Sequence, residues 1–293
     1  MPWTWRDRVE HLRATGRLPS FRHPVTLNEK ILERKRRFCH GNRLFAFMAD
    51  KHAVRSYVAE RIGSSYLVPL LGEASDRAGV QALLEGCGSC VVKPTHGAGM
   101  VRVIDSELTS QECDEVASLA MDWMDVNYAD AQCEAHYALI TPRIILEQRI
   151  GAVGEVLIDY KFHVFRQRDG GARTILQVVS GRFDGPLQRA FYEDDYSNPI
   201  SGSHVIELAD TALIIEARRL SEKLLGDLPY ARIDWYVSAG RLYFGEITIT
   251  PAAGCGAGYG RELDLEMGAM WIVSDSLYSD QQLAGCAAMS QEL

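Results

Sequence analysis

The sequence predicts an α+β protein, and three observations predict it. Capping boxes at Thr26–Glu29 and Thr109–Glu112 open amphipathic segments, which indicates helices. The stretch 231–254, ARIDWYVSAGRLYFGEITITPAAG, has two arms rich in β-branched and aromatic residues around a short turn at Ala239 and Gly240. Such arms around a tight turn predict a β-hairpin. No internal repeat or low-complexity tract competes with these elements, so helices and hairpins in one chain favour the α+β class.

Length and composition set the class of protein. At 293 residues, with 47% hydrophobic and 24% charged residues, the chain can bury one large core or two ordinary ones. A net charge of −8 opposes broad affinity for nucleic acid or membrane surfaces, although it allows a local basic site for phosphates. No run of about 18 apolar residues appears, so we expect a cytoplasmic protein without a membrane span.

The seven cysteines are scattered and are consistent with reduced thiols. Cys87 and Cys90 have the spacing of a redox or zinc pair, but no second pair completes a zinc site. The alternative, two small residues before a buried strand, is the interpretation we favour.

The first part of the chain is predicted to be helical. Residues 1–48 are charged and carry helical spacing, and we interpret the charged run 33–37 as a solvated face. Residues 49–62 repeat the amphipathic spacing, and Gly63 can end that helix. An extended segment is expected at 68–71.

Strands and turns dominate the remainder. A buried strand at 90–94, a glycine-rich turn at 95–99 and a strand at 100–104 predict a second hairpin. The stretch 180–203 has no clear periodicity, and a loop of that length is more often functional or mobile than structural. The other expected elements are strands at 144–146, 156–165 and 173–179, a helix from Asp210 to Gly226, and a last helix after the glycine-dense 254–260.

The late hairpin groups oxygen-bearing side chains. It places Asp234 and Glu246 on neighbouring strands, where the two carboxylates would face one another. Residues two apart share a strand face, which puts the Thr248 hydroxyl beside Glu246. Carboxylates and a hydroxyl suit Mg²⁺, which keeps waters and substrate phosphates in its shell. A surface hairpin with incidental charges is the alternative that these residues alone leave open.

Several motifs follow one another in a family-specific order. They are LNEKI at 27–31, ADKHAVRSYV at 49–58, YLVPLLG at 66–72, VVKPTHGAG at 91–99, DYKFHVF at 159–165, and ARIDWY with GEITITP near the end. Together they resemble the ATP-grasp superfamily and, within it, the TupA-like group associated with bacterial polysaccharide and teichuronopeptide synthesis. The resemblance implies an ATP-grasp fold in which two α+β subdomains, 49–149 and 150–293, clasp ATP after a short helical segment, 1–48.

The resemblance also implies an ATP site. The resemblance implies that Lys51, Lys93 and a flexible glycine-rich cover contact the phosphates. It implies that a hinge contacts adenine and that Asp159 contacts ribose. The residues of the cover are His96, Gly97 and Gly99, and those of the hinge are Glu147, Gln148 and Ile150. A surface position is the alternative for each lysine, but Lys93 lies in an apolar strand, where an unpaired charge would be costly.

Metal and catalytic roles follow from the same resemblance. Asp234 and Glu246 match the Mg²⁺ carboxylates of the superfamily, and Thr248 stands where asparagine is usual, which leaves the number of bound ions open. Arg232 matches the arginine aimed at the reacting phosphoryl group, a role that suits a planar guanidinium. Lys161 is implied to contact the γ-phosphate or the substrate carboxylate, with an exposed ion pair to its neighbour two residues earlier as the alternative.

Arg182 and Arg189, in the long loop, are candidates for binding an acidic substrate, although exposed loop arginines are commonly just solvated. The implied activity is that of an ATP-dependent carboxylate-amine ligase, which forms an amide through an acyl phosphate and releases ADP and phosphate. Its partners would be a small-molecule or saccharide carboxylate and an amine, with no nucleic acid. The sequence does not set the oligomeric state.

Alternatives of other classes remain. Only about 48 residues precede the Asp50-Lys51 motif, where ligases of the superfamily carry a longer substrate domain, so a phosphotransferase acting on a hydroxyl stays open. A glycosyltransferase fits the polysaccharide association, but no Asp-x-Asp motif appears and 193–195, EDD, is a poor substitute. A non-catalytic nucleotide-binding protein would tolerate loss of Asp234 or Glu246, and both are present.

Overall fold

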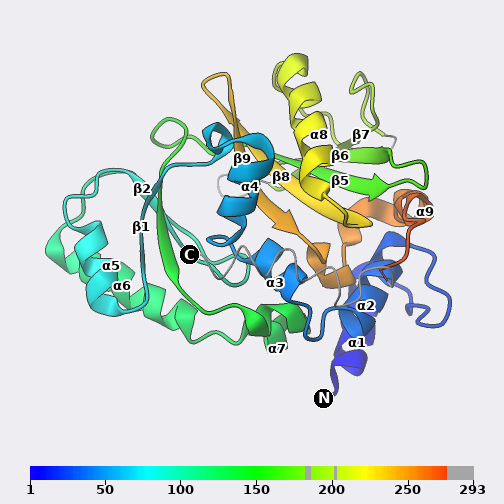
Figure 1. The fold of residues 1–293 in the computed structure, drawn as a ribbon, viewed down its shortest axis with the longest axis horizontal. Helices are drawn as coiled ribbons and strands as arrows, with labels where there is room; N and C mark the ends of the chain where they lie inside the picture. Colours follow the sequence, from blue (N-terminus) through cyan, green and yellow to red (C-terminus); the bar gives the residue numbers. More distant parts are fainter. Residues whose placement is uncertain (182–185, 201–202, 276–293) are drawn as a thin grey trace.

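Two antiparallel sheets organise the molecule. The computed structural model describes residues 1–181, 186–200 and 203–275, so Arg182 lies outside the described residues. One sheet has four strands in the order β1-β4-β2-β3, and the other has five in the order β7-β6-β5-β8-β9. Figure 1 shows them at opposite ends of the molecule, with helices packed on both. The predicted α+β class is confirmed.

Four helices open the chain, as the helical spacing predicted. They are α1 (Trp3–Thr15), α2 (Leu27–Arg37), α3 (Arg43–Ala49) and α4 (Val54–Ile62). The capping box is present at α2, because Thr26 accepts from the backbone N–H of Glu29 and the Glu29 side chain returns to Thr26. The predicted helix 49–62 begins later than expected, because the Asp50 carboxylate accepts from the backbone of His52 and Ala53 and starts α4 there.

The charged run 33–37 is not a solvated face throughout. Arg34 is 0% and Lys35 is 2% exposed. Arg34 lies one turn beyond Ile31 and Lys35 lies two turns beyond Leu27, so both are on the inward side of α2. Each finds a buried acidic partner, Asp275 for Arg34 and Asp7 for Lys35. The prediction was therefore wrong for these two positions.

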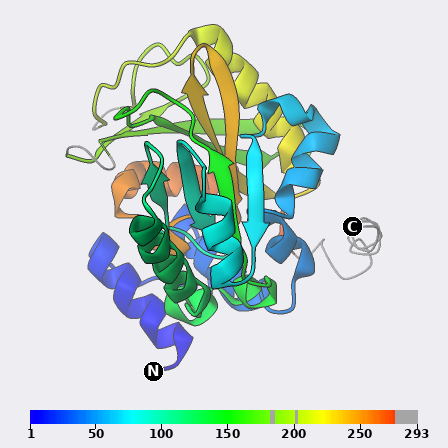
Figure 2. The same ribbon diagram turned by 90° about the vertical axis from the view of Figure 1, so that its left-hand side faces the viewer.

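The four-stranded sheet is built from short strands with two helices on one face (Figure 2). The strands are β1 (Leu70–Ala74), β2 (Cys90–Pro94), β3 (Arg102–Ile104) and β4 (Ile144–Gln148); the helices are α5 (Arg77–Leu84) and α6 (Ser110–Met124), followed by α7 (Tyr128–Gln132) and a 3-10 turn, η2 (Ala135–Leu139). The β2–β3 hairpin and the capping box at Thr109 are confirmed. Cys87 and Cys90 are free thiols, and Cys90 packs in the core of this sheet, in line with the structural interpretation.

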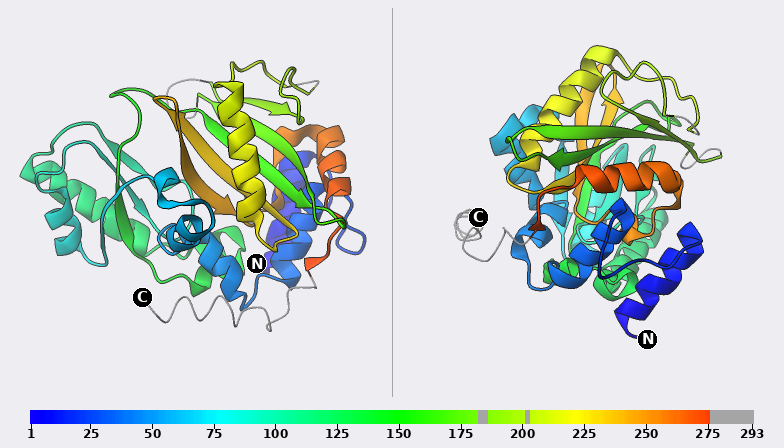
Figure 3. Two further views of the ribbon diagram at one scale, coloured as in Figure 1. Left: turned by 45° about the horizontal axis from the view of Figure 1, so that its top comes forward. Right: turned by 90° about the vertical axis from the view of Figure 1, so that its right-hand side faces the viewer.

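The five-stranded sheet carries α8 on one face and α9 on the other (Figure 3). Its strands are β5 (Asp159–Arg166), β6 (Ala172–Ser180), β7 (Gln188–Tyr192), β8 (Tyr230–Ser238) and β9 (Arg241–Thr248); the helices are α8 (Thr211–Leu225) and α9 (Gly260–Met270). The α8 face joins α4 in the largest apolar core. Within the described residues, no helix combines the length and apolarity needed to cross a lipid bilayer.

The stretch 180–203 is not wholly a loop. Residues 188–192 form β7, an edge strand paired with β6. Ala190 and Tyr192 face the large core, while Phe191 packs on the opposite side near α9. Because both faces of this short strand are buried, its sequence shows no polar–apolar alternation, and the periodicity test missed it.

Candidate active site

Pairing across the five-stranded sheet brings the predicted charged residues together. Lys161 of β5 pairs with Asp234 of β8, and Asp234 pairs with Glu246 of β9. In the next row Arg232 pairs with Thr248. Paired residues share a face, and residues two apart on one strand do as well. The five side chains therefore project from one face of the sheet, the face opposite α8.

A β-bulge at Gly245 makes this arrangement possible. The register shifts between Asp234 and Trp235, so that Trp235 pairs with Phe244 and Gly245 is the extra residue. Without the bulge, Tyr243 and Glu246 would point to opposite faces. With it, both share the face of Asp234, while Phe244 joins the apolar core.

Replacing Gly245 with Ala is expected to lower the free energy of unfolding by about 1–3 kcal/mol, because the added methyl overpacks the bulge. A Cβ there would lie 3.0 Å from the Asp234 carbonyl oxygen and 3.1 Å from the Tyr236 ring. Urea denaturation measures the change. Gly88→Ala is the matched control, because nothing lies within 4 Å of its Cβ position; equal stability of the two variants would contradict the close packing.

Arg232 is the centre of the ion-pair network on this face. Its Nε and Nη2 donate to the two oxygens of Asp234 at 2.7 and 2.8 Å. Nη2 also donates to Glu246 Oε1 and to Thr248 Oγ1, both at 3.0 Å, and the Thr248 hydroxyl donates to Glu246 at 2.9 Å. The guanidinium thus holds both carboxylates and the hydroxyl in one fixed group.

Lys161 completes the network from the neighbouring strand. Its Nζ lies 2.6 Å from Asp234 Oδ2 and 3.0 Å from Asp159 Oδ1, and its side chain is 7% exposed. The ion pair predicted as an exposed alternative is therefore buried, where a charge needs its partners. Burial alone would raise the pKa of Asp234, but Arg232 and Lys161 outweigh it and hold that pKa well below its usual range. Asp234 is thus ionised at neutral pH.

Two lysines reach this region from the other sheet and its flank. Lys93 of β2 lies 2.5 Å from Glu147 of β4, and Arg55 lies 2.8 Å from the other oxygen of Glu147. The Lys51 amine donates to the carbonyl of Gly97 in the glycine-rich turn. Burial lowers the pKa of Lys51, Glu246 opposes that shift and Lys93 reinforces it. Charges from both sheets therefore act on one another.

The glycine-rich turn after β2 depends on its glycines. Gly97 and Gly99 have φ values of 98° and 82°, in the region that favours glycine. A Cβ on Gly97 would lie 2.5 Å from the ring of Tyr128. His96 beside it is buried at 3% exposure, and burial lowers its pKa, so its imidazole is held neutral.

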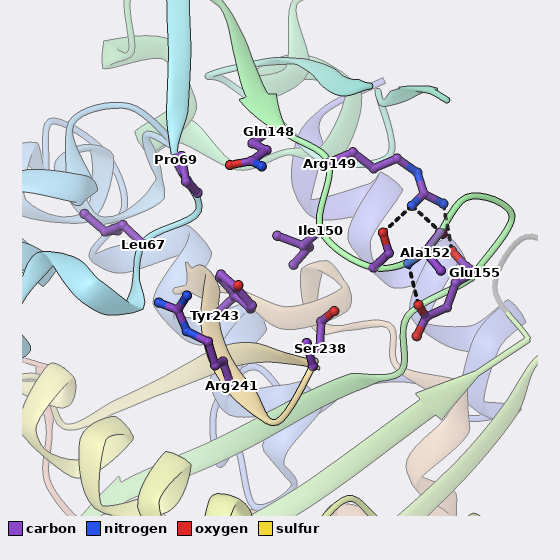
Figure 4. Close-up of a pocket in the computed structure, with 12 residues that line it drawn as sticks. Leu67, Pro69, Gln148, Arg149, Ile150, Ala152, Glu155, Ser238, Arg241 and Tyr243 are labelled. Atoms are coloured by element: carbon purple, nitrogen blue, oxygen red, sulfur yellow. Dashed lines mark hydrogen bonds between the residues drawn. The ribbon is translucent and has the colours of Figure 1, made fainter. Parts of the chain in front are cut away.

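A cavity of about 580 Å³ lies between the two sheets where the chain crosses from one to the other. Figure 4 shows Gln148 and Ile150 of the crossing segment on one side and Tyr243 of β9 on the other, with Leu67 and Pro69 nearby. The lining is mixed, because apolar and aromatic side chains such as Ile150 and Tyr243 stand beside charged ones. The charged lining residues are Arg149, Glu155 and Arg241. Apolar surface with a few placed polar groups is the usual lining of a small-molecule site. Of the three predicted hinge residues, Gln148 and Ile150 line this cavity, whereas the Glu147 carboxylate is held by Lys93 and Arg55.

The cavity and the charged group lie along one strand. Ser238, at the cavity, is four residues from Asp234 on β8, a separation of about 13 Å in an extended strand. That length is comparable to an extended nucleoside triphosphate. The site therefore has a recess with a mixed apolar and polar lining at one end and a cluster of lysine, arginine and carboxylate groups at the other.

The second loop arginine lies away from this centre. Arg189 is the second residue of β7, in the row of Val179 and Asp159 and at the sheet edge. Its side chain packs against Gly258, whose Cβ position is 2.9 Å from Arg189 Cδ. The structure thus places Arg189 on the same face of the sheet but at its edge, two strands from Lys161.

Sequence reasoning missed a buried acid–base cluster behind the site. Glu134 accepts from the Thr250 hydroxyl just after β9, and burial raises its pKa to about 7. The Lys35 amine lies 2.7 Å from Asp7 and 3.0 Å from the carbonyl of Ala253. These contacts fix the segment 250–256, where Ala252 and Ala253 both have a φ of 51°. The inward spacing of Lys35 on its helix was the available signal.

The donor set fits a metal carried with a phosphate substrate. Asp234, Glu246 and Thr248 offer the oxygen donors that Mg²⁺ prefers. Within the part of the chain that the structure describes, no three His, Cys, Asp or Glu side chains are grouped to hold a metal by themselves. Two carboxylates and a hydroxyl fit an ion that completes its shell with water and phosphate oxygens.

Two antiparallel sheets joined by a crossing segment, with a network of lysine, arginine and carboxylate side chains on the face of one of them, are the arrangement expected of the ATP-grasp class. The chain belongs to the TupA-like ATP-grasp family, whose model matches residues 29–272. The family and fold expected from the sequence motifs are thereby confirmed.

Solved structures with a similar fold are distant in sequence. D-Alanine-D-alanine ligase from Helicobacter pylori is 16% identical with a TM-score of 0.49, covering 78% of this chain and 62% of that one. D-Alanyl-alanine synthetase A from Vibrio cholerae is 13% identical with a TM-score of 0.44, covering 80% and 68%. The chain thus spans less than two thirds of the Helicobacter ligase. No curated protein matches this chain.

Proposed function

We propose that this protein is an ATP-dependent carboxylate-amine ligase that activates an acid as an acyl phosphate and releases ADP and phosphate. The observation that carries the proposal is the single charged face, on which Lys161, Arg232 and Asp234 interlock, and which lies along β8 from the cavity between the two sheets. No Ser-His-Asp or Cys-His arrangement is needed, because positioning and electrostatics perform phosphoryl and acyl transfer.

In the first half-reaction, a carboxylate oxygen of the substrate attacks the γ-phosphorus, and the bond from that phosphorus to the β-bridging oxygen breaks. Lys51 and Lys93 neutralise the triphosphate from one side, and Lys161 contacts the γ-phosphate from the other. Gln148 and Ile150 hold the base, and Asp159 contacts the ribose. His96 and the glycines beside it approach the phosphates through their backbone.

Asp234, Glu246 and Thr248 would hold Mg²⁺, which supplies charge neutralisation to the phosphate oxygens. In the second half-reaction, the amine attacks the acyl carbon, the acyl–oxygen bond to phosphate breaks, and the departing phosphate takes up the proton that the amine nitrogen loses. Arg232 stabilises the oxyanion of the tetrahedral intermediate, because its guanidinium is fixed by three neighbours on the same face. Arg189 at the sheet edge is proposed to bind an acidic substrate.

The proposed substrates follow from the association of the TupA-like group with polysaccharide and teichuronopeptide synthesis. We propose sugar acids and amino acids as the carboxylates, with an amine as the acceptor. Purified protein with ATP and Mg²⁺ is screened against uronic acids and amino acids for phosphate release, and hydroxylamine is added to trap the acyl phosphate as a hydroxamate.

ADP, phosphate and a hydroxamate together would support the ligase. ADP with a stable phosphorylated product and no free phosphate would instead assign a phosphotransferase. Indifference to ATP with consumption of a sugar nucleotide would assign a glycosyltransferase, and either result would overturn the proposal.

A further inference from the structure

The charge of this chain is unevenly distributed. Residues 1–43 contain eleven Lys or Arg and four Asp or Glu, a formal charge of +7, whereas the whole chain carries −8. The remaining 250 residues therefore carry −15. Two of these cations are neutralised by acids outside the segment, Arg34 by the buried Asp275 and Arg6 by Asp130, which lowers the formal +7 by 2 to +5. The segment is still basic, whereas the chain as a whole is acidic.

Large apolar side chains are exposed on the same segment. Of the sixteen exposed large hydrophobic residues in the described ranges, five lie within residues 1–25. Trp5 is 56% and Leu18 is 68% exposed. Trp5 and Leu12 are two turns apart on α1, opposite the buried Asp7 and His11. Figures 1 and 2 show α1 at the outer edge of the molecule, where no helix or strand of the described residues covers this side.

Guanidinium groups and aromatic rings alternate across this surface. The Arg8 guanidinium lies 5.5 Å from the centre of Trp5 and 5.1 Å from that of Phe21, and Arg36 lies 4.1 Å from the same Phe21 ring. These contacts join α1, the connector 16–26 and α2 into one surface. Arg17 and Arg22 on the connector have no acidic partner among the described residues. We call this surface the basic-aromatic face.

We propose that the basic-aromatic face docks onto an anionic lipid bilayer. Cations attract the negative surface, while exposed Trp and Leu side chains gain by entering the boundary between head groups and acyl chains. An acidic polysaccharide or a nucleic acid would use the arginines but would leave Leu12, Leu18 and Val25 in water. The combination of free arginines with exposed aliphatic residues therefore favours the bilayer.

Docking in this way places the active site near the membrane. The inner side of α1 contacts the segment that follows β9, because His11 Nδ1 lies 3.0 Å from the Gly254 carbonyl oxygen. An α-helix with its side chains is about 10–12 Å thick. The segment 250–256 would therefore lie about one helix diameter from the bilayer, which suits an acceptor that is itself attached to a lipid.

Co-sedimentation tests the proposal. The full chain is pelleted with vesicles of phosphatidylcholine alone and with vesicles of equal phosphatidylcholine and phosphatidylglycerol, at low and high salt. We expect binding to the mixed vesicles that weakens with salt, and no binding to phosphatidylcholine alone. Arg17→Glu/Arg22→Glu and Trp5→Ser/Leu18→Ser should each weaken vesicle binding at least tenfold.

The matched control is Arg168→Glu/Arg173→Glu, the same charge change at two exposed arginines, one in the β5–β6 turn and one at the start of β6. It should bind like the parent protein. Three results would overturn the proposal. The first is that the parent protein does not bind the mixed vesicles, and the second is that the control loses as much binding as the test variants. The third is that Trp5→Ser/Leu18→Ser binds the vesicles fully and the protein is captured by soluble polygalacturonate. ATP turnover without vesicles should be unchanged in every variant, so failure of the ligase proposal would appear in that assay alone.

Discussion

Glu246→Gln is expected to reduce ATP turnover by at least about 10²–10³-fold while leaving the fold intact. The amide can still accept from Arg232 Nη2 and from the Thr248 hydroxyl, the two bonds that Glu246 Oε1 makes. The substitution removes the negative charge that is proposed to help hold Mg²⁺. The same charge opposes the lowering of the Lys51 pKa by burial. A coupled assay of ADP release at saturating ATP measures the effect, and circular dichroism with urea denaturation checks the fold.

Glu60→Gln is the matched control, because Glu60 is exposed on α4. It should turn over ATP at the parental rate. If the lost function of Glu246→Gln is metal binding, raising the Mg²⁺ concentration should recover part of the activity. Parental turnover in Glu246→Gln would rule out the proposed metal role of this carboxylate.

Local sequence patterns were sufficient for the centre of this site. The hairpin carrying Asp234 and Glu246 could be predicted because alternation and a tight turn depend only on neighbouring residues. The capping boxes at Thr26 and Thr109 were predictable for the same reason. Even so, the bulge at Gly245 was not foreseen, although it decides which β9 residues share the face of Asp234.

Long-range partners were what the sequence could not supply. Arg34 looks like one of several surface charges until Asp275, 241 residues later, is folded against it. Glu134 meets Thr250 across 116 residues, and no periodicity connects them. A charged residue is buried only when such a partner is present, so its position depends on tertiary structure rather than on local spacing.

Arg34→Met is expected to lower the free energy of unfolding by about 3–5 kcal/mol, the cost of breaking a buried ion pair from one side. Arg34 donates through Nε and Nη2 to both oxygens of Asp275 at 2.9 and 2.8 Å. Through Nη1 it also donates to the carbonyls of Tyr230 and Ile249 at 2.9 and 2.8 Å. Methionine fills much of the volume but leaves a carboxylate and two carbonyls without donors. Urea denaturation measures the loss.

Arg37→Met on the same helix is the control. It separates the effect of breaking the buried ion pair from the effect of removing a positive charge. Its side chain is 66% exposed and forms a surface ion pair with Glu33 one turn earlier, so we expect a change below about 0.5 kcal/mol. Adding Asp275→Leu to Arg34→Met should recover part of the stability, because the unpaired buried carboxylate is then removed. Arg34 also donates to the carbonyls of Tyr230, the first residue of β8, and Ile249, the residue that follows β9. If the double variant is no more stable than Arg34→Met, these two carbonyl contacts, rather than the ion pair, stabilise the hairpin that carries the site.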